Sequence, residues 1–473
     1  MMKYKRCFLT IAAVFLLCSA TAGCAFRTVP AESASGSADP VQTPTPAPEL
    51  PVFTVTYTLD GQEIGSERVT QGTSPVSIPC VSGSRGIIAW KNSNGTETDV
   101  WGARIAADTV FEAVLGPELN MTGGYFDPES DGLFHPLNKF TRSDAARAVY
   151  AVMAVKPSGE TFLKDVTTRA KCWDAATSLV TQGYMTLDEN GKFFPDVAIT
   201  KADLTDLLGR LFAPGAVKAA LADLPEPLNR AQAAGLINGL LGLTTADSLP
   251  YYPDVAPEAD YYVAVSLAGK EGSLPWTEGE RAPEGFINLD GYLYYVRSSG
   301  YFLCDGMLGT LYFDRTGRYT SGDEALDKFV ADIIDSQIKK DMSREEMLRD
   351  MYVYVRDHYL YLRRNYYAIA ETGWEIPEAL IMFQTGKGNC YNFTAAFWAL
   401  ARGVGYDAVC YSGLVGVERD PHSWVEIENN GEPRIFDVET EMQYRLIDDY
   451  ITSMYNIDYD RGALWSYVRD PEG

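Results

Sequence analysis

The feature that most constrains the fold is an internal repeat within residues 118–272. Its clearest copies read DGLFHPLNKFTRSDAARAVYAVM and ENGKFFPDVAITKADLTDLLGRLF, with a weaker one in EPLNRAQAAGLINGLL. Between them run FLKDVTTRAKCWDAATSLVTQGYM and a partial copy, YYPDVAPEADYYVAVSLAGKEG. One unit of this size cannot bury its own apolar helix face, so its neighbours must cover it. The sequence therefore predicts an all-α array of packed helical repeats, in which the weakest unit lacks its first helix.

Each of the two clearest copies carries a signal for the start of a helix. Thr141 and Thr200 stand where an N-cap is expected, and Asp144 and Asp203 follow at the position that closes a capping box. An acid also suits the positive N-terminal end of a helix. We therefore expect two helices to begin directly after these threonines.

The repeats resemble S-layer homology repeats, which share the Phe-x-Asp-Val start, the Gly-x-Phe-x-Pro turn and the Thr-Arg helix start. The resemblance implies cell-wall polysaccharide as a partner, with Arg142, Lys201 and Arg230 in the family's basic binding position. An arginine fork suits a phosphate or pyruvate group because it can bond in a bidentate manner. The alternative is a helical packing module that has lost its ligand, because Lys201 replaces arginine and Gln232 replaces the acid.

A second segment, GKGNCYNFTAAFWALARGVGYDAVCYSGLVG, points to chemistry. Cys390 follows a glycine-flanked turn and opens an apolar run with helical periodicity. His422 lies in the short alternating strand PHSWVEI, and Asp437 closes the strand in RIFDVET. A helix N-terminus and an imidazolium both favour the thiolate, which is the nucleophilic form, and an acid orients the imidazole. These are the parts of a Cys-His-Asp acyl-transfer site, which needs neither metal nor cofactor.

The chain from residue 323 to its end resembles the transglutaminase-like superfamily, a branch of the papain-like cysteine enzymes. The match rests on the Gly-x-Cys at a helix start, the hydrophobic strand after it, the His-x-Trp in a strand and the Asp that ends the next strand. The resemblance implies that Cys390, His422 and Asp437 form a catalytic triad. It also implies an α+β domain over residues 323–473, with helices packed on an antiparallel sheet.

Two further residues are expected at the site. Gln384 occupies the position where papain-like enzymes place an oxyanion-hole glutamine, and the backbone N–H of Cys390 is a second candidate donor. Trp424 is expected to wall the site beside His422, with core packing as its alternative.

Attack of the thiolate on a peptide or glutamine amide would give a thioester, which either water or a substrate amine could resolve. The sequence leaves hydrolysis and transamidation open, and we favour a peptidase or hydrolase acting at the cell wall. Two alternatives remain. The triad could assemble without activity, or the protein could be a non-catalytic adhesion or scaffold protein.

The N-terminus reads MMKYKRCFLTIAAVFLLCSATAGCA, which predicts a signal peptide over residues 1–23. Thr-Ala-Gly-Cys at its end resembles the lipobox of bacterial lipoproteins, which implies lipidation of Cys24 and a membrane partner through that lipid. Residues 24–50 are rich in Pro, Ser, Thr and Ala, which is typical of a disordered tether. Ordinary secretion is the alternative, and both place the protein outside the cell.

Two smaller regions complete the organisation. Residues 51–117 resemble the B repeats of bacterial surface adhesins, which implies a small β-grasp-like domain with Trp90 in its core. Residues 273–322 hold two aromatic hairpin units, GYLYYVRSSGYF and GTLYFDRTGRYTSG, which resemble cell-wall repeats of the choline-binding type. Two such units are too few to be stable alone, so we expect a connector packed on a neighbouring domain.

The amino-acid composition limits the classes of partner that the protein can bind. The formal net charge is −24 and no cluster of Lys and Arg offsets it, so the surface repels nucleic acid and anionic lipid headgroups. This excludes nucleic acid as a partner. The cysteines beyond residue 24 are odd in number and scattered over several proposed domains, which is not the pattern of a disulfide framework: Cys80, Cys172, Cys304, Cys390 and Cys410.

Overall fold

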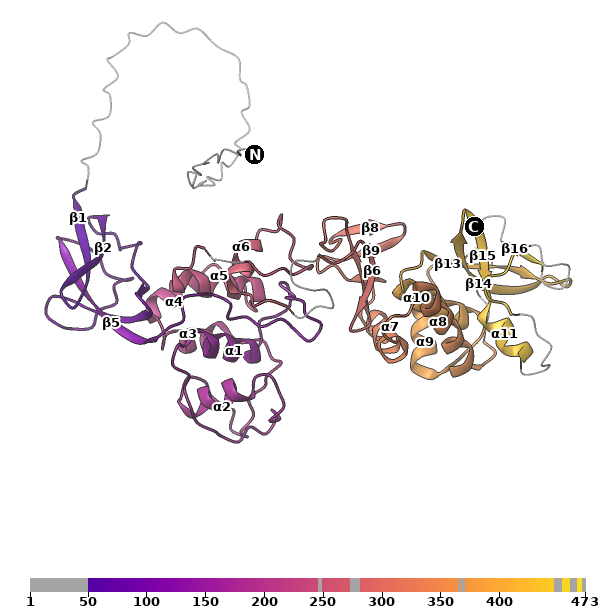
Figure 1. The fold of residues 1–473 in the computed structure, drawn as a ribbon, viewed down its shortest axis with the longest axis horizontal. Coiled ribbons are helices and arrows are strands. Elements are labelled where there is room, and N and C mark those ends of the chain that lie inside the picture. Colours follow the sequence, from indigo (N-terminus) through magenta and orange to yellow (C-terminus); the bar gives the residue numbers. More distant parts are fainter. Residues whose placement is uncertain are drawn as a thin grey trace, which may run out of the picture. The chain divides into compact units, whose positions relative to one another are not determined.

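The computed structural model describes residues 50–245, 249–272, 281–364, 367, 371–445, 453–459 and 466–469. The predicted signal peptide, Cys24 and nearly all of the predicted tether lie outside the described residues. The chain is multidomain and combines helices with sheets (Figure 1). Its two largest apolar cores are separate, one formed within residues 55–268 and the other within residues 326–442.

The first block is a five-stranded mixed sheet. Its strands run in the order β2-β1-β5-β4-β3, and the central pair β1–β5 is parallel while the others are antiparallel. Residues 50–117, all described, contain no α-helix, and the β-grasp-like description stays a prediction. Trp90 is buried as expected, with its ring 5.1 Å from that of Tyr57. The strands are β1 (Val52–Leu59), β2 (Gln62–Thr70), β3 (Val81–Ser82), β4 (Arg85–Lys91) and β5 (Thr109–Glu118).

The described residues of the predicted repeats contain six helices. They are α1 (Arg142–Val152), α2 (Trp173–Thr181), α3 (Lys201–Leu208), α4 (Pro214–Leu221), α5 (Arg230–Leu241) and α6 (Tyr262–Ala268). Helix α4 corrects the expectation that the weakest unit lacks its first helix. Pro214 occupies the first turn, where its missing N–H costs nothing, and Val217 and Leu221 bury the apolar face.

The segments that precede α1, α3 and α5 meet through backbone hydrogen bonds. The N–H of Phe140 donates to the carbonyl of Leu228 at 2.9 Å, and its own carbonyl accepts from Ile199 at 3.1 Å. Thr141 caps α1 in a complete capping box with Asp144, as predicted. Repeats related in sequence are thus joined at equivalent points of their backbones.

Asp165 and Asp254, the aspartates of two of the Asp-Val motifs, each fasten a turn elsewhere in the repeats. The two carboxylate oxygens of Asp165 accept from the backbone N–H groups of Phe193 and Phe194, each at 2.7 Å. Asp254 accepts in the same way from Phe134 and His135. The two aspartates at equivalent positions in the sequence therefore have the same role, which is to accept two backbone hydrogen bonds from a turn.

Two small sheets of hairpins lead into the last block. They contain β6 (Gly285–Leu289) with β7 (Tyr292–Val296), and β8 (Gly306–Leu308) with β9 (Leu311–Phe313) and β10 (Tyr319–Thr320). The guanidinium of Arg402 donates to the Tyr319 hydroxyl at 2.8 Å and to the Thr310 carbonyl at 2.6 Å. Because Arg402 belongs to the helix described next, these hydrogen bonds tie the hairpins to the last block.

The last block places helices against an antiparallel sheet. Helix α10 (Cys390–Gly403) is buried along almost its whole length and contacts α8, α9 and the sheet (Figure 1). The sheet runs in the order β15-β14-β13-β16, and every neighbouring pair is antiparallel. The other elements are α7 (Glu324–Gln337), α8 (Arg344–His358), β11 (Leu360–Tyr361), α9 (Glu375–Thr385), β12 (Lys387–Gly388), β13 (Ala408–Val415), β14 (Asp420–Asn429), β15 (Glu432–Phe436), α11 (Val438–Arg445) and β16 (Tyr467–Arg469).

Candidate active site

Cys390 is the first residue of α10. Asn389 caps the helix, and Asn389 and Asn392 form a reciprocal capping box. Gly388 packs so closely on this turn that a Cβ there would meet the side chain of Asn392 at 2.2 Å. The tight turn places the thiol at the positive end of the helix, where the unpaired N–H groups favour a thiolate.

A buried polar network holds this turn. The side-chain amide of Asn392 donates to the Glu378 carbonyl at 3.0 Å. The Glu378 carboxylate also accepts from the Arg364 guanidinium at 2.7 Å and from the Tyr367 hydroxyl at 2.5 Å. Because these partners come from α9 and from the segment that precedes it, the start of α10 is positioned by tertiary contacts as well as by its own cap.

His422 and Asp437 come together from two antiparallel strands. His422 lies in β14, and Asp437 directly follows β15, the neighbouring strand. His422 Nε2 lies 2.7 Å from Asp437 Oδ2, and both residues are buried. Nδ1 is then the ring nitrogen left to exchange a proton with Cys390, which lines the same cavity.

Opposing effects set the charge of the imidazole. Burial alone would lower the pKa of His422, but the Asp437 carboxylate and hydrogen bonding to Cys390 raise it well above its ordinary value. Burial would likewise raise the pKa of Asp437, yet the net shift is downward because of His422 and hydrogen bonds from Thr440 and Tyr467. The pair therefore favours an imidazolium beside a carboxylate, which is the arrangement that stabilises a thiolate.

Asp437 has a structural task besides orienting His422. Its Oδ1 accepts from the backbone N–H of Thr440 at 3.0 Å, so the carboxylate also closes the first turn of α11. Its Oδ2 accepts from the Tyr467 hydroxyl of β16 at 2.7 Å. These bonds fix the carboxylate that orients the imidazole.

A second carboxylate, which the sequence analysis assigned no role, flanks the imidazole. Glu439 Oε2 lies 3.9 Å from His422 Nδ1, and the residue is 5% exposed. The side-chain amide of Gln443, one helical turn on, donates to Glu439. Burial raises the pKa of Glu439 to about 7, against the lowering effect of His422. The only signal in the sequence was an acid two residues after Asp437.

The site opens into a cavity of about 480 Å³. The thiol and the imidazole reach it from α10 and β14, and α11 contributes Glu439 and Gln443. The segment at β11 adds Tyr361 and Arg363, because its backbone runs beside β12 and brings it next to Cys390. The full lining is Tyr361, Arg363, Cys390, Val415, Gly416, Asp420, Pro421, His422, Glu439, Thr440, Gln443 and Tyr444.

Two residues predicted at the site do not line this cavity. Gln384 lies near the end of α9 with an exposed side chain. Trp424 is fully buried, with its ring 5.1 Å from that of Tyr467 and its indole N–H donating to Glu426 at 3.0 Å. Trp424 therefore supports the site from behind, as in the packing alternative, because Tyr467 in turn contacts Asp437.

The basic residues predicted to bind polymer have different surroundings. The guanidinium of Arg230 is 2% exposed and is paired with Asp144 and Glu129. Arg142 donates to the carbonyls of Phe193 and Thr186, each at 2.7 Å. Polymer contact through either arginine would have to compete with these bonds. Lys201, at the same motif position, is partly exposed, and none of the described side-chain hydrogen bonds or ion pairs involves its amine.

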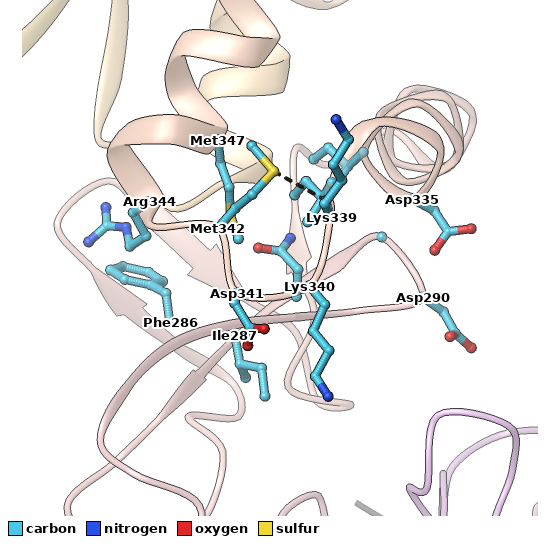
Figure 2. A pocket seen from close by; sticks show the side chains of 14 residues that line it. Phe286, Ile287, Asp290, Asp335, Lys339, Lys340, Asp341, Met342, Arg344 and Met347 are labelled. Carbon is cyan, nitrogen blue, oxygen red and sulfur yellow. Dashed lines mark hydrogen bonds between the residues drawn. The ribbon is translucent and has the colours of Figure 1, made fainter. Parts of the chain in front are cut away.

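A second cavity, of about 390 Å³, lies between the β6–β7 hairpin and the turn that joins α7 to α8 (Figure 2). The guanidinium of Arg344 lies over the ring of Phe286, and the Lys339 backbone N–H donates to the Met342 sulfur at 3.2 Å. The described residues that line it mix both charges and include no cysteine, serine or histidine. This cavity therefore offers neither a thiol nor an imidazole, and the acyl-transfer chemistry rests on the cavity at Cys390.

Replacing Glu439 with Gln is expected to stabilise the protein more at about pH 8 than at about pH 4. Between the ordinary pKa of a glutamate and a pH of about 7, Glu439 keeps its proton in the folded chain but has lost it in the unfolded chain. The free energy of unfolding of the wild type therefore falls as pH rises through this window. Glutamine does not titrate, so the variant lacks this decrease in stability. Urea unfolding at both pH values measures it. Exposed Glu432, replaced with Gln, is the control, and an equal effect of Glu439→Gln at both pH values would contradict the prediction.

In the part of the chain that the structure describes, no helix combines the length and apolar composition that a membrane crossing requires. Residues 331–432 match the family model of the transglutaminase-like superfamily, and residues 163–205 match that of the S-layer homology domain. The first match ends before Asp437 and Glu439. A search of curated proteins found no match.

Among solved structures, the chain is similar to a protein described as "a Putative Cysteine Protease from Cytophaga hutchinsonii", at 14% identity and a TM-score of 0.21. The alignment covers 32% of this chain and 47% of that one. Nothing about this chain is inferred from so weak a likeness, and its assignment rests on the two family matches. The chain therefore carries a transglutaminase-like domain at residues 331–432 and an S-layer homology domain at residues 163–205.

Proposed function

We propose that the transglutaminase-like domain is a thiol acyl-transfer enzyme that cleaves peptide or glutamine amides. The observation that carries the proposal is the convergence of Cys390, His422 and Asp437 on one buried site beside a cavity. The thiol lies at a helix N-terminus, and the imidazole is held by a carboxylate on its far nitrogen. Each feature favours a reactive thiolate at neutral pH.

The chemistry proceeds in two steps. The proton of the Cys390 thiol moves to Nδ1 of His422, and the thiolate attacks the amide carbonyl to form a carbon–sulfur bond. The oxyanion rests on the backbone N–H of Cys390 at the start of α10. His422 then protonates the leaving amine as the carbon–nitrogen bond breaks, which leaves a thioester. Attack by water, with its proton passing to His422, releases the acid and restores the thiol.

Hydrolysis is favoured over amine transfer by the lining of the cavity. Arg363, Asp420 and Tyr444 line it and are exposed, so water reaches the thioester. A transamidase needs a site that admits an amine while keeping water out. We therefore infer a peptidase or amidohydrolase, with a protein-crosslinking transglutaminase as the alternative.

The proposed location at the cell surface rests on the segments that precede the transglutaminase-like domain. An S-layer homology domain indicates association with the cell surface or cell wall. A lipid on Cys24 and a disordered tether would add a membrane anchor, and that combination suits wall peptides or surface proteins as substrates. The same domain favours the second candidate function, a non-catalytic wall-binding scaffold.

One assay separates these functions. The full-length protein is incubated with a peptide library and a labelled primary amine, and cleavage and amine incorporation are read by mass spectrometry. We expect cleavage products that disappear in Cys390→Ala and persist in Cys410→Ala. Cys410, in β13, is the matched control, because burial raises its pKa well above the ordinary value of a thiol.

The other outcomes are equally informative. Amine incorporation that depends on Cys390 would replace hydrolase with transamidase. Equal products from wild type and Cys390→Ala would overturn the enzyme proposal. No product from any variant, together with retained binding to cell-wall sacculi, would favour the scaffold.

A further inference from the structure

Helix α11 begins with two buried acids that have different partners. Glu439 and Glu441 are each 5% exposed. Glu441 accepts from the Arg356 guanidinium at 2.7 Å and from the Tyr352 hydroxyl at 2.9 Å. Within the described residues, Glu439 pairs with no lysine or arginine, and its ion-pair partner is His422. An acid in the first turn stabilises a helix without being buried, so that role does not account for the burial of Glu439.

The two oxygens of the Glu439 carboxylate have different surroundings. The side-chain amide of Gln443 donates to Oε1, and both residues line the cavity at Cys390. Oε2 lies 3.9 Å from His422 Nδ1, which is too long for a hydrogen bond, and no hydrogen bond among the described residues ends on it. Burial raises the pKa of Glu439 to about 7, the direction expected of a buried carboxylate without a fixed cation. Oε2 is therefore an acceptor that is held in place beside the imidazole.

The spacing of Nδ1 and Oε2 suits one amine nitrogen bonded to both. The leaving amine must come within hydrogen-bond reach of His422 Nδ1 to be protonated, at about 2.9 Å. A nitrogen about 2.9 Å from each of two atoms that lie 3.9 Å apart makes an angle of about 85° between them. The tetrahedral angle of an amine is about 24° wider, so each hydrogen bond bends by about 12° from linear, which is within the usual range. An amine at the imidazole can therefore donate an N–H to Glu439.

We propose that Glu439 binds the amine of the substrate, accepting an N–H from the leaving nitrogen while His422 Nδ1 gives that nitrogen its proton. The inference rests on the proposed reaction and names its substrate class. The substrates are amides whose leaving nitrogen carries a hydrogen, which include glutamine side chains and peptide bonds to residues other than proline.

The step balances without a further reactant. The proton on Nδ1 passes to the nitrogen, the carbon–nitrogen bond breaks with its electron pair going to nitrogen, and a neutral amine leaves the thioester. The amine then takes a second proton from solvent, and the carboxylate of Glu439 holds the ammonium ion until it diffuses away. Because the nitrogen gains positive charge as it is protonated, its hydrogen bond to a carboxylate strengthens toward the transition state, which raises the rate.

The first test compares an amide with an ester. Two substrates carry the same acyl peptide, the best-cleaved one of the library, as its propylamide and as its propyl ester. We expect Glu439→Gln in the full-length chain to lower kcat/KM for the amide about tenfold or more and for the ester less than about threefold. The ester oxygen has no hydrogen to donate, so it cannot use the carboxylate. The matched control is Glu418→Gln, an exposed acid that does not line the cavity, which should leave the ratio of the two rates unchanged.

A second measurement needs neither cleavage nor a variant that folds. The thiol of Cys390 in the wild type is modified by 2-aminoethyl methanethiosulfonate, which carries an ammonium group, and by neutral methyl methanethiosulfonate, and peptide mass mapping follows both reactions. The salt concentration is about 1 M, which screens the field of the acidic surface. Relative to the neutral reagent, we expect the cationic one to react about tenfold faster with the folded chain than with the chain unfolded in urea.

The outcomes distinguish the amine site from the reaction. The same reagent preference in the folded and the unfolded wild type would overturn the amine site. An equal loss of amide and ester cleavage in a Glu439→Gln protein with the circular dichroism spectrum of the wild type would do so too, and would leave the proposed function standing. A wild type that favours the cationic reagent but cleaves neither substrate would refute the proposed reaction and leave Glu439 as an amine-binding residue.

Discussion

Replacing His422 with Ala is expected to reduce peptide cleavage by about a thousandfold or more. The imidazole has two tasks in the proposed reaction, which are to accept the proton of Cys390 and to return it to the leaving amine. Burial lowers the pKa of the imidazole, but Asp437 and Cys390 raise it well above its ordinary value, which favours the protonated ring that donates to the amine. Without the imidazolium, the remaining help for the thiolate is the N-terminus of α10.

The same variant should change how fast Cys390 reacts with an alkylating agent. Alkylation of Cys390 by iodoacetamide at about pH 6 is expected to be faster in the wild type than in His422→Ala, because the variant has no imidazolium to pair with the sulfur. A profile from about pH 5 to about pH 9, read at the Cys390 peptide, measures the difference. The matched control is His358→Ala, since that ring stacks on Tyr354 at 4.0 Å in α8 and does not line the cavity. Coinciding profiles for His422→Ala and the wild type would refute the imidazolium–thiolate pair.

Replacing Arg230 with Ala is expected to lower the free energy of unfolding of the repeats by about 3–5 kcal/mol, as when one partner of a buried ion pair is removed. The guanidinium lies 5.2 Å from the ring centre of Phe126 and 5.0 Å from that of Phe134. It also pairs with the carboxylate of Asp144, which is 6% exposed. Removal leaves that carboxylate buried without its cation, which accounts for most of the expected cost.

The repeat itself provides the control for this prediction. Lys201 occupies the same position at the start of α3, but its side chain is partly exposed. Lys201→Ala should change the free energy of unfolding by no more than about 0.5 kcal/mol. Urea unfolding followed by circular dichroism measures both variants. Similar values for Arg230→Ala and Lys201→Ala would show that the buried pair does not hold the array together. A double-mutant cycle with Asp144→Ala would isolate the pairwise term.

Local signals in the sequence predicted the local structure well. The caps at Thr141 and Thr200 were predictable because donor and acceptor lie within three residues of each other. The same holds for the helix start at Cys390, where a turn precedes an apolar run. Helix α4 was missed because its sequence, PGAVKAAL, is short and alanine-rich and has no side chain that caps its start.

At the site, the sequence indicated the reacting groups but not their surroundings. Cys390 begins a helix, His422 lies within a strand and Asp437 directly follows one, and the sequence pattern predicts each of these elements. Gln384 was placed by analogy with papain-like enzymes, and the structure leaves it exposed on α9. Glu439 carried no signal of its own beyond its charge.

The sequence alone determined the elements, since hydrophobic period, caps and turns depend on residues close together in the chain. It also determined the acyl-transfer chemistry to be expected, because the residue types themselves limit that choice. Only the tertiary structure decided that Glu439 and Tyr467 join the triad, that Trp424 lies behind it, and that Arg230 is buried in an ion pair. The physical reason is that burial and charge pairing depend on what strands and helices far apart in the chain bring into contact.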